Sequence, residues 1–242
     1  MDWTGTWLQA VWLVRPQRLA EWCRLIDVWS RSSALDRGTA LLVAVPPEAA
    51  THRSLENPDY LPELHWAGDR QVILDALRHS FPVRLELTAQ KGSGISEFRV
   101  ESIVNGDDSL SLYLSVPLNL FEGVDDGVSR RRFSDFLAIC TELFVPEIVI
   151  AGTIGEEAQL HGLDALEREI GRWTARAFYG EELGAELAER HLAAHSPAFR
   201  QQVQPAGLFV AWAEWPEWRE APVAWREAVL SILKAVGVHR ES

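Results

Sequence analysis

Three segments with alternating apolar and polar side chains follow one another in the middle of the chain, and they constrain the fold more than any other feature. They span residues 83–89, 97–104 and 110–116, with turn-forming sequences at 90–94 and 105–108 between them. A period of two is typical of a strand that has one buried and one solvated face. Because short, turn-rich connections favour hairpins, the sequence predicts an antiparallel meander with one face in water.

Other apolar segments predict the elements that surround this meander. The expected strands are residues 6–14, 40–45, 147–153 and 208–212. The expected helices are residues 16–29, 69–80, 129–144 with Ser129 as the cap, and a final helix from 221 or 222 to a C-cap at Gly237. Residues 156–194 are expected to be helix-rich, with an interruption near Gly180. The fold class that follows is α+β, a single domain over 1–242 in which helices pack on an antiparallel or mixed sheet.

The charge of the chain limits the classes of partner. The 242 residues include 23 Lys and Arg but 35 Asp and Glu, for a net charge of −12. Such a protein repels phosphate backbones and anionic membranes, so neither direct nucleic-acid binding nor membrane binding is expected. Residues 101–169 contain 14 acids and only 4 bases. This segment is either a solvated acidic face or a surface that meets a basic partner or binds cations.

Localisation and redox state are predicted from the termini and the cysteines. The first five residues carry no basic segment, and no apolar run approaches the length of about 20 residues that spans a bilayer. The sequence therefore predicts a soluble, cytoplasmic protein. Cys23 and Cys140 do not make a disulfide framework, and each is expected to be a small buried side chain.

Motifs for catalysis or metal binding are weak. His191 and His195 have the spacing of two ligands on one helix face, but Leu192 stands where a zincin has glutamate. A structural role near a helix C-terminus is the better interpretation. Gly92-Ser93-Gly94 has the composition of a hairpin turn and lacks the lysine of a phosphate loop. The chain is therefore expected to be no enzyme and to need no metal, cofactor or small-molecule substrate.

Acidic and aromatic side chains offer candidate contacts for a protein partner. Arg130-Arg131-Arg132 would oppose the helix dipole in a first turn, so pairing with nearby acids or contact with an acidic group is expected. Of Trp212, Trp215 and Trp218, core packing is the general expectation, and a partly exposed one would be an interface anchor. The candidate partner-binding residues are Asp107, Asp108, Glu122, Asp125, Asp126, Glu156, Glu157, Trp215 and Trp218.

The order of elements resembles that of the immunity protein 52 family. The points of resemblance are the opening Trp-rich strand and helix, Leu112-Tyr113-Leu114 at the end of the meander, and the strand 207–212 with its final helix. The resemblance implies a non-enzymatic inhibitor of a bacterial toxin, with a restriction-endonuclease-like nuclease of a type VI secretion system as the partner. An acidic binder would mask the basic surface that a nuclease needs for phosphates.

Two other classes of function stay open at this point. One is a small hydrolase-like enzyme that uses acidic residues of 101–169, which would need carboxylates converging in a pocket. The other is an oligomeric scaffold or accessory protein. A flat acidic face without a deep cleft would favour the binding protein.

Overall fold

The structure is a computed structural model that describes residues 6–14, 28, 31–32, 95, 105, 109–203 and 206–236 in full. For residues 41–45, 64–65, 81–88 and 97–104 it describes the strands without their side chains. Several predictions fall outside these residues: almost all of the helix 16–29, the helix 69–80, the turn 90–94, Cys23, Asp107, Asp108 and Gly237.

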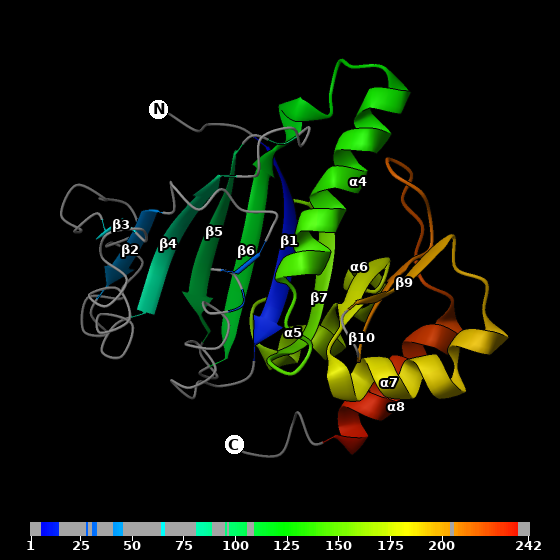
Figure 1. Ribbon diagram of the computed structural model, residues 1–242. Helices are drawn as coiled ribbons and strands as arrows, with labels where there is room; N and C mark the ends of the chain where they lie inside the picture. Colours follow the sequence, from blue (N-terminus) through cyan, green and yellow to red (C-terminus); the bar gives the residue numbers. More distant parts are fainter. Residues whose placement is uncertain are drawn as a thin grey trace.

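Ten described strands form one sheet (Figure 1). They are β1 (Trp7–Val14), β2 (Leu41–Val45), β3 (Leu64–His65), β4 (Phe81–Thr88), β5 (Glu97–Val104), β6 (Leu110–Pro117), β7 (Val149–Glu156), β8 (Arg176–Tyr179), β9 (Phe199–Val203) and β10 (Gly207–Ala211). Their order is β3-β2-β4-β5-β6-β1-β7-β8-β10-β9. Every pairing among these strands is antiparallel, and β4, β5 and β6 are the predicted meander. The α+β prediction is confirmed.

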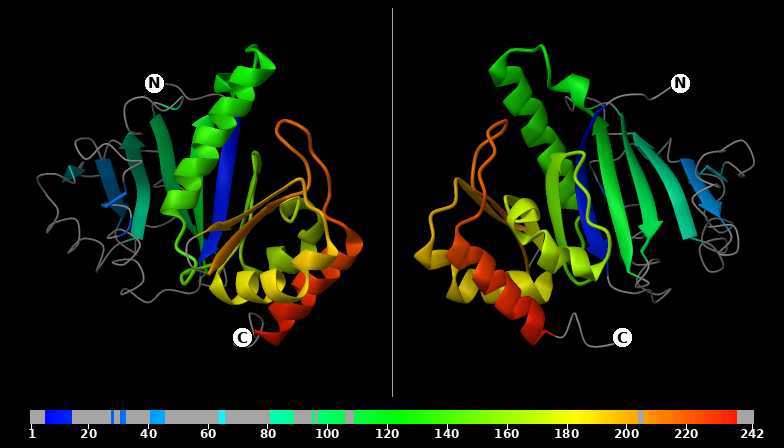
Figure 2. Two further views of the ribbon diagram at one scale, coloured as in Figure 1. Left: turned by 45° about the vertical axis from the view of Figure 1, so that its right-hand side comes forward. Right: turned by 180° about the vertical axis from the view of Figure 1, so that it is seen from behind.

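Helices cover both faces of the sheet around β1. One core joins α4 (Asp126–Leu143) to residues such as Trp12 on β1. The second core, on the other face, contains Val11 and Leu13 and side chains of the remaining helices. These are α5 (Leu163–Arg168), α6 (Ile170–Trp173), α7 (Glu181–Arg190) and α8 (Val223–Ala235). Figures 1 and 2 show α4 in front of β1 in one view and α5 in front of it when the molecule is seen from behind.

The prediction of a solvated face is wrong for β6, where the last strand of the meander is buried on both sides. Its alternate serines, Ser111 and Ser115, lie in the interior. The Ser111 hydroxyl donates to the carbonyl of Leu160, and the Ser115 hydroxyl accepts a hydrogen bond from Gln9 Nε2 at 3.1 Å. These hydrogen bonds satisfy the buried hydroxyls, so serine is tolerated on a strand face that was predicted to be exposed to solvent.

The helix α4 begins four residues earlier than predicted. Asp125, not Ser129, is its N-cap, and the Asp125 carboxylate accepts from the backbone N–H of Gly127 at 2.8 Å. Ser129 is instead buried within the first turns. Asp125 therefore has a structural role in addition to its charge, since removing a side-chain cap costs about 1 kcal/mol.

The region predicted to be helix-rich contains a strand and short helices. β8 lies between α6 and α7, and Gly180 follows it directly. α7 ends at Arg190, and a turn of 3-10 helix, η4 (Leu192–Ala194), separates His191 from His195. The two imidazoles are therefore not on one helix face, and His195 instead packs edge-on against Trp212 and Trp225. No helix among the described residues is long and apolar enough to cross a membrane.

A buried thiol and a buried phenol are expected to make the fold less stable at alkaline pH. Burial raises the pKa of the Cys140 thiol and of the Tyr179 phenol above their ordinary values of 9.0 and 10.0, and the hydrogen bond from Trp225 to Tyr179 opposes the second shift only in part. As the pH rises above these ordinary values, the unfolded chain loses both protons, whereas the folded protein keeps them. Stability is therefore complete below about pH 9 and falls as the pH rises, by about 1.4 kcal/mol per pH unit for each group.

This prediction is checked by urea unfolding between about pH 8 and pH 11. The variant Cys140→Ala should begin its decline near pH 10 instead of pH 9, because only the phenol then remains. A free energy of unfolding that stays constant over this range would contradict the assignment.

Candidate functional site

Most of the described candidate residues gather at one end of the sheet. There the first residues of β1 meet the end of β7 and the 3-10 turn η3 (Leu118–Leu120) that precedes α4. The N–H of Glu157 donates to the carbonyl of Trp7 at 2.9 Å, and the N–H of Leu118 donates to that of Thr6 at 3.0 Å. The segment 212–222, between β10 and α8, reaches the same end and contacts α4 (Figure 1).

Trp215 anchors this segment to α4. Its ring stacks on Phe133 with centroids 4.8 Å apart, and its edge approaches Phe121. The indole N–H donates to the hydroxyl of Ser129 at 3.1 Å, so the residue is only 6% exposed and its polar atom is satisfied. The interpretation of Trp215 as an exposed partner contact is therefore wrong in this structure. Its role is to hold the segment 212–222 in place.

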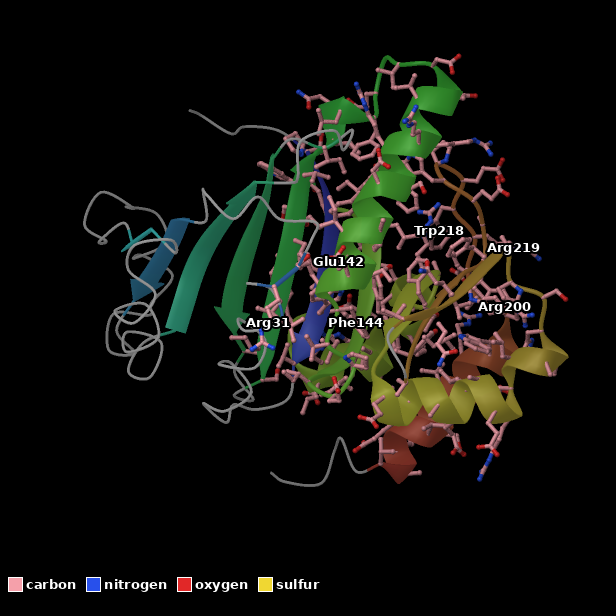
Figure 3. The ribbon with its side chains drawn as sticks, in the orientation of Figure 1. Arg31, Glu142, Phe144, Arg200, Trp218 and Arg219 are labelled. Carbon is pink, nitrogen blue, oxygen red and sulfur yellow. The ribbon has the colours of Figure 1, made fainter. Side chains whose placement is uncertain are left out.

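Trp218 is the exposed tryptophan of the cluster. Its side chain is 56% exposed, whereas Trp212 and Trp215 are buried. Figure 3 labels Trp218 and the following Arg219 on the right-hand side of the molecule. An indole that is half in water, on a segment fixed by the buried Trp215, is a candidate contact for a partner.

The acidic candidates at this end are solvent-exposed. Glu122 and Asp126 flank the cap of α4, and Glu156 and Glu157 end β7. Glu157 has a left-handed backbone with φ of 46°, which is an uncommon conformation for a residue with a side chain. Residues in sparsely populated backbone conformations cluster at functional sites.

The acidic excess of residues 101–169 does not form one surface. Val104 and Leu110, the described strand ends of β5 and β6, lie at the opposite end of the sheet from Glu156, because β1 pairs Val14 with Leu110 but Leu8 with Glu156. On α5, Glu167 forms an ion pair with Lys234 at 3.0 Å. The acids at the α4 end are thus a subset of the excess.

The three consecutive arginines of α4 lie beyond its first turn, which differs from the sequence prediction. Arg130 forms an ion pair with Glu214 at 2.6 Å, and Arg132 donates to the carbonyl of Leu120. The predicted pairing with Glu122, Asp125 and Asp126 is not among these contacts. Because α4 starts at Asp126, the arginines do not oppose the dipole at its N-terminus.

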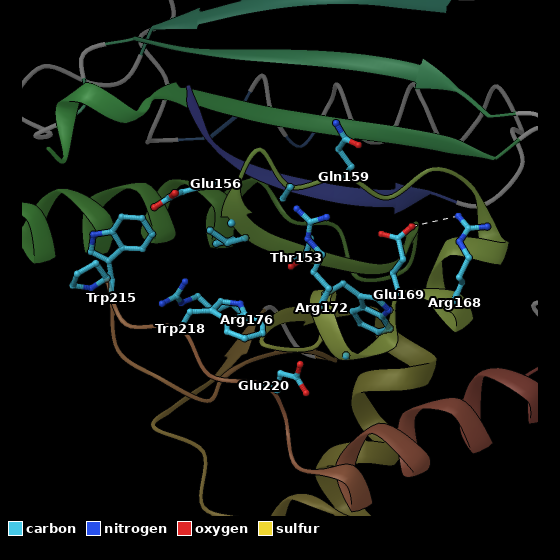
Figure 4. A pocket seen from close by; sticks show the side chains of 16 residues that line it. Thr153, Glu156, Gln159, Arg168, Glu169, Arg172, Arg176, Trp215, Trp218 and Glu220 are labelled. Carbon is cyan, nitrogen blue, oxygen red and sulfur yellow. Dashed lines mark hydrogen bonds and ion pairs between the residues drawn. The ribbon is translucent and has the colours of Figure 1, made fainter. Parts of the chain in front are cut away.

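A pocket of about 720 Å³ opens beside these residues (Figure 4). It is lined by the end of β7, the helices α5 and α6, Arg176 of β8 and the segment 215–220. Its charged lining residues are Glu156, Arg168, Glu169, Arg172, Arg176 and Glu220, and Trp215 and Trp218 also line it. In Figure 4, Glu156, Arg176 and Trp215 lie near one another at one end, and Arg168 and Glu169 at the other.

Arg176 is the buried cation of this pocket. It is 3% exposed, and its guanidinium lies 5.3 Å from the ring centre of Trp215. Its Nη2 donates to the backbone carbonyls of Glu217 and Glu214. Burial lowers the pKa of Arg176, and the charge of Glu156 opposes that shift. This pocket was not predicted from the sequence, where its signal is an arginine at every fourth residue from 168 to 176.

Two of the three carboxylates that line the pocket form ion pairs with arginines. Glu169 forms an ion pair with Arg168 at 3.3 Å, and Glu220 with Arg226 at 3.2 Å. Within the described part of the chain, no group of three His, Cys, Asp or Glu residues is placed to hold a metal ion. This arrangement suits the binding of a partner or ligand better than general acid–base chemistry by paired acids.

Comparison with known proteins does not assign a function to this site. The comparisons with protein-family models, with curated proteins and with solved structures find no match to this chain. The resemblance to the immunity protein 52 family therefore stays a prediction.

Proposed function

We propose that this chain is an immunity protein, a non-enzymatic inhibitor that binds a bacterial toxin in the cytoplasm. The toxin that fits is a basic nuclease domain of a type VI secretion effector. The observation that carries the proposal is the exposed Trp218 at the same end of the sheet as four exposed acids, Glu122, Asp126, Glu156 and Glu157.

Electrostatic attraction and apolar packing would have different effects at such an interface. The acids would attract a basic nuclease and raise the rate of encounter, while an exposed tryptophan would supply buried apolar contact in the complex. A nuclease covered at its basic surface cannot take up a phosphate backbone, so binding alone would neutralise it. No catalytic group on the inhibitor is needed for this mechanism.

The proposal is tested by producing the chain together with nuclease toxins encoded in neighbouring genes. We expect one of them to form a stoichiometric complex on size-exclusion chromatography and to lose its toxicity to cells. Trp218→Ala should weaken that complex about tenfold or more, as the loss of an interface anchor does.

Val223→Ala is the matched control, because Val223 is also apolar and is 59% exposed, but on α8. It should leave the complex unchanged. If no neighbouring toxin is bound or neutralised, the proposal fails.

A further inference from the structure

We infer that the pocket between β7, α6 and the segment 215–220 binds a small anion that carries a flat ring. The expected contacts are an oxyanion, carboxylate or phosphate, on Arg172 and Arg176, and the ring against Trp218. This inference does not depend on the proposed toxin binding, since it concerns a small molecule and the walls of one cavity.

The charged residues that line the pocket balance one another, three arginines against three glutamates, although the protein as a whole is acidic. Four arginines, Arg168, Arg172, Arg176 and Arg226, line it or pair with its walls, against the three glutamates 156, 169 and 220. The chain as a whole has a net charge of −12. Because Glu169 and Glu220 are paired with Arg168 and Arg226, Glu156 is the one lining acid left opposite Arg172 and Arg176 among the described residues. This arrangement favours a small anion, while the acids of the chain disfavour a long nucleic acid.

Two of these arginines have N–H donors that no described residue accepts. Arg168 and Arg226 are paired with Glu169 and Glu220, but the guanidinium of Arg172 has no hydrogen bond or ion pair with any residue that the structure describes. Arg176 Nε is buried and also lacks a hydrogen-bond partner among the described residues. A buried donor without a partner is costly, and guanidinium groups bind carboxylate and phosphate with paired N–H donors.

The aromatic walls and the size of the pocket indicate the rest of the ligand. Trp218 lines the cavity and is half exposed, and it has no ring contact with another described residue. Indole faces stack on flat rings, and the volume of about 720 Å³ lies within the range of pockets for small molecules. A nucleoside monophosphate and an aromatic carboxylic acid share this chemistry.

Calorimetric titration of the intact chain in chloride buffer tests the inference, with adenosine monophosphate and hydroxybenzoate as probes. Binding of the first alone identifies a phosphate ligand, binding of the second alone identifies a carboxylate ligand, and binding of both identifies the shared chemistry. Arg172→Gln and Trp218→Ala should each weaken the binding about tenfold. Two control variants, Arg131→Gln on α4 and Phe199→Ala on β9, should leave it unchanged, since both residues are exposed and lie outside the pocket.

Three results would overturn the inference. The first is that neither probe binds at about 10 mM, far above the range of ordinary small-molecule affinities. The second is that inorganic phosphate binds as tightly as adenosine monophosphate, because the ring would then have no role. The third is that binding survives both pocket substitutions, because the arginine and the tryptophan would then have no role.

Discussion

Gly180→Ala should prevent the chain from folding. A Cβ at this position would lie 1.7 Å from the carbonyl oxygen of Val149 and 2.9 Å from that of Pro146. Both obstacles are backbone atoms, so no side-chain rotation relieves the overlap. The N–H of Gly180 also donates to Ile150 at 3.0 Å, which fixes the close approach of the β8–α7 junction to β7. We expect a loss of about 4 kcal/mol or more, which is a large part of the stability of an ordinary domain.

Gly155→Ala provides the matched control for this prediction. The nearest atom to a Cβ there is the Cβ of Ala158 at 3.7 Å, which is an ordinary contact. Its free energy of unfolding should stay within about 0.5 kcal/mol of the wild type. Circular dichroism and urea unfolding compare the two variants, and a Gly180→Ala protein with native stability would show that the junction is looser than described.

Reversal of the charges at the α4 end should slow the association with the toxin about tenfold or more at low salt. The variant carries lysine in place of Glu122, Asp126, Glu156 and Glu157, and it keeps Asp125 because that residue caps α4. Steering by exposed charges changes association rates by factors of about 10 to 1,000. The rates are measured by stopped flow with the purified toxin.

The control for charge reversal is a variant with the same change in net charge, made on other helices. It carries lysine in place of Asp164, Glu181, Glu189 and Glu227, which are exposed on α5, α7 and α8. Because steering depends on where the charge lies as well as on its amount, this variant should associate several times faster than the first. Equal rates for the two variants would mean that only the net charge matters.

Local sequence patterns predicted the elements that have strong periodicity. The strands β1, β2, β7 and β10 and the helices α4 and α8 appear where the apolar spacing indicated them, with shifted ends. β8 has four residues that are all buried, including Arg176, so it shows no alternation. β9 has four exposed residues and contains Arg and two Gln, so its composition does not indicate a strand. Pairing with β10 determines its structure.

The site was predicted less completely because burial there depends on distant residues. Trp215 and Trp218 are three positions apart and look equivalent in the sequence. Only Trp215 meets Phe133 and Ser129, which are more than 80 positions away in the chain. The pocket likewise joins β7 to a segment that follows β10. Long-range contacts of this kind leave no local period to detect.

The most direct test of the proposed function is the association rate of the wild-type chain with its toxin as a function of ionic strength. We expect a rate that falls steeply with added salt, because the Debye length shortens from about 10 Å at 0.1 M to about 3 Å at 1 M. The charge-reversed variant should show a much weaker dependence. A wild-type rate that is independent of salt and equal to that of the variant would contradict binding through the acidic end of the sheet.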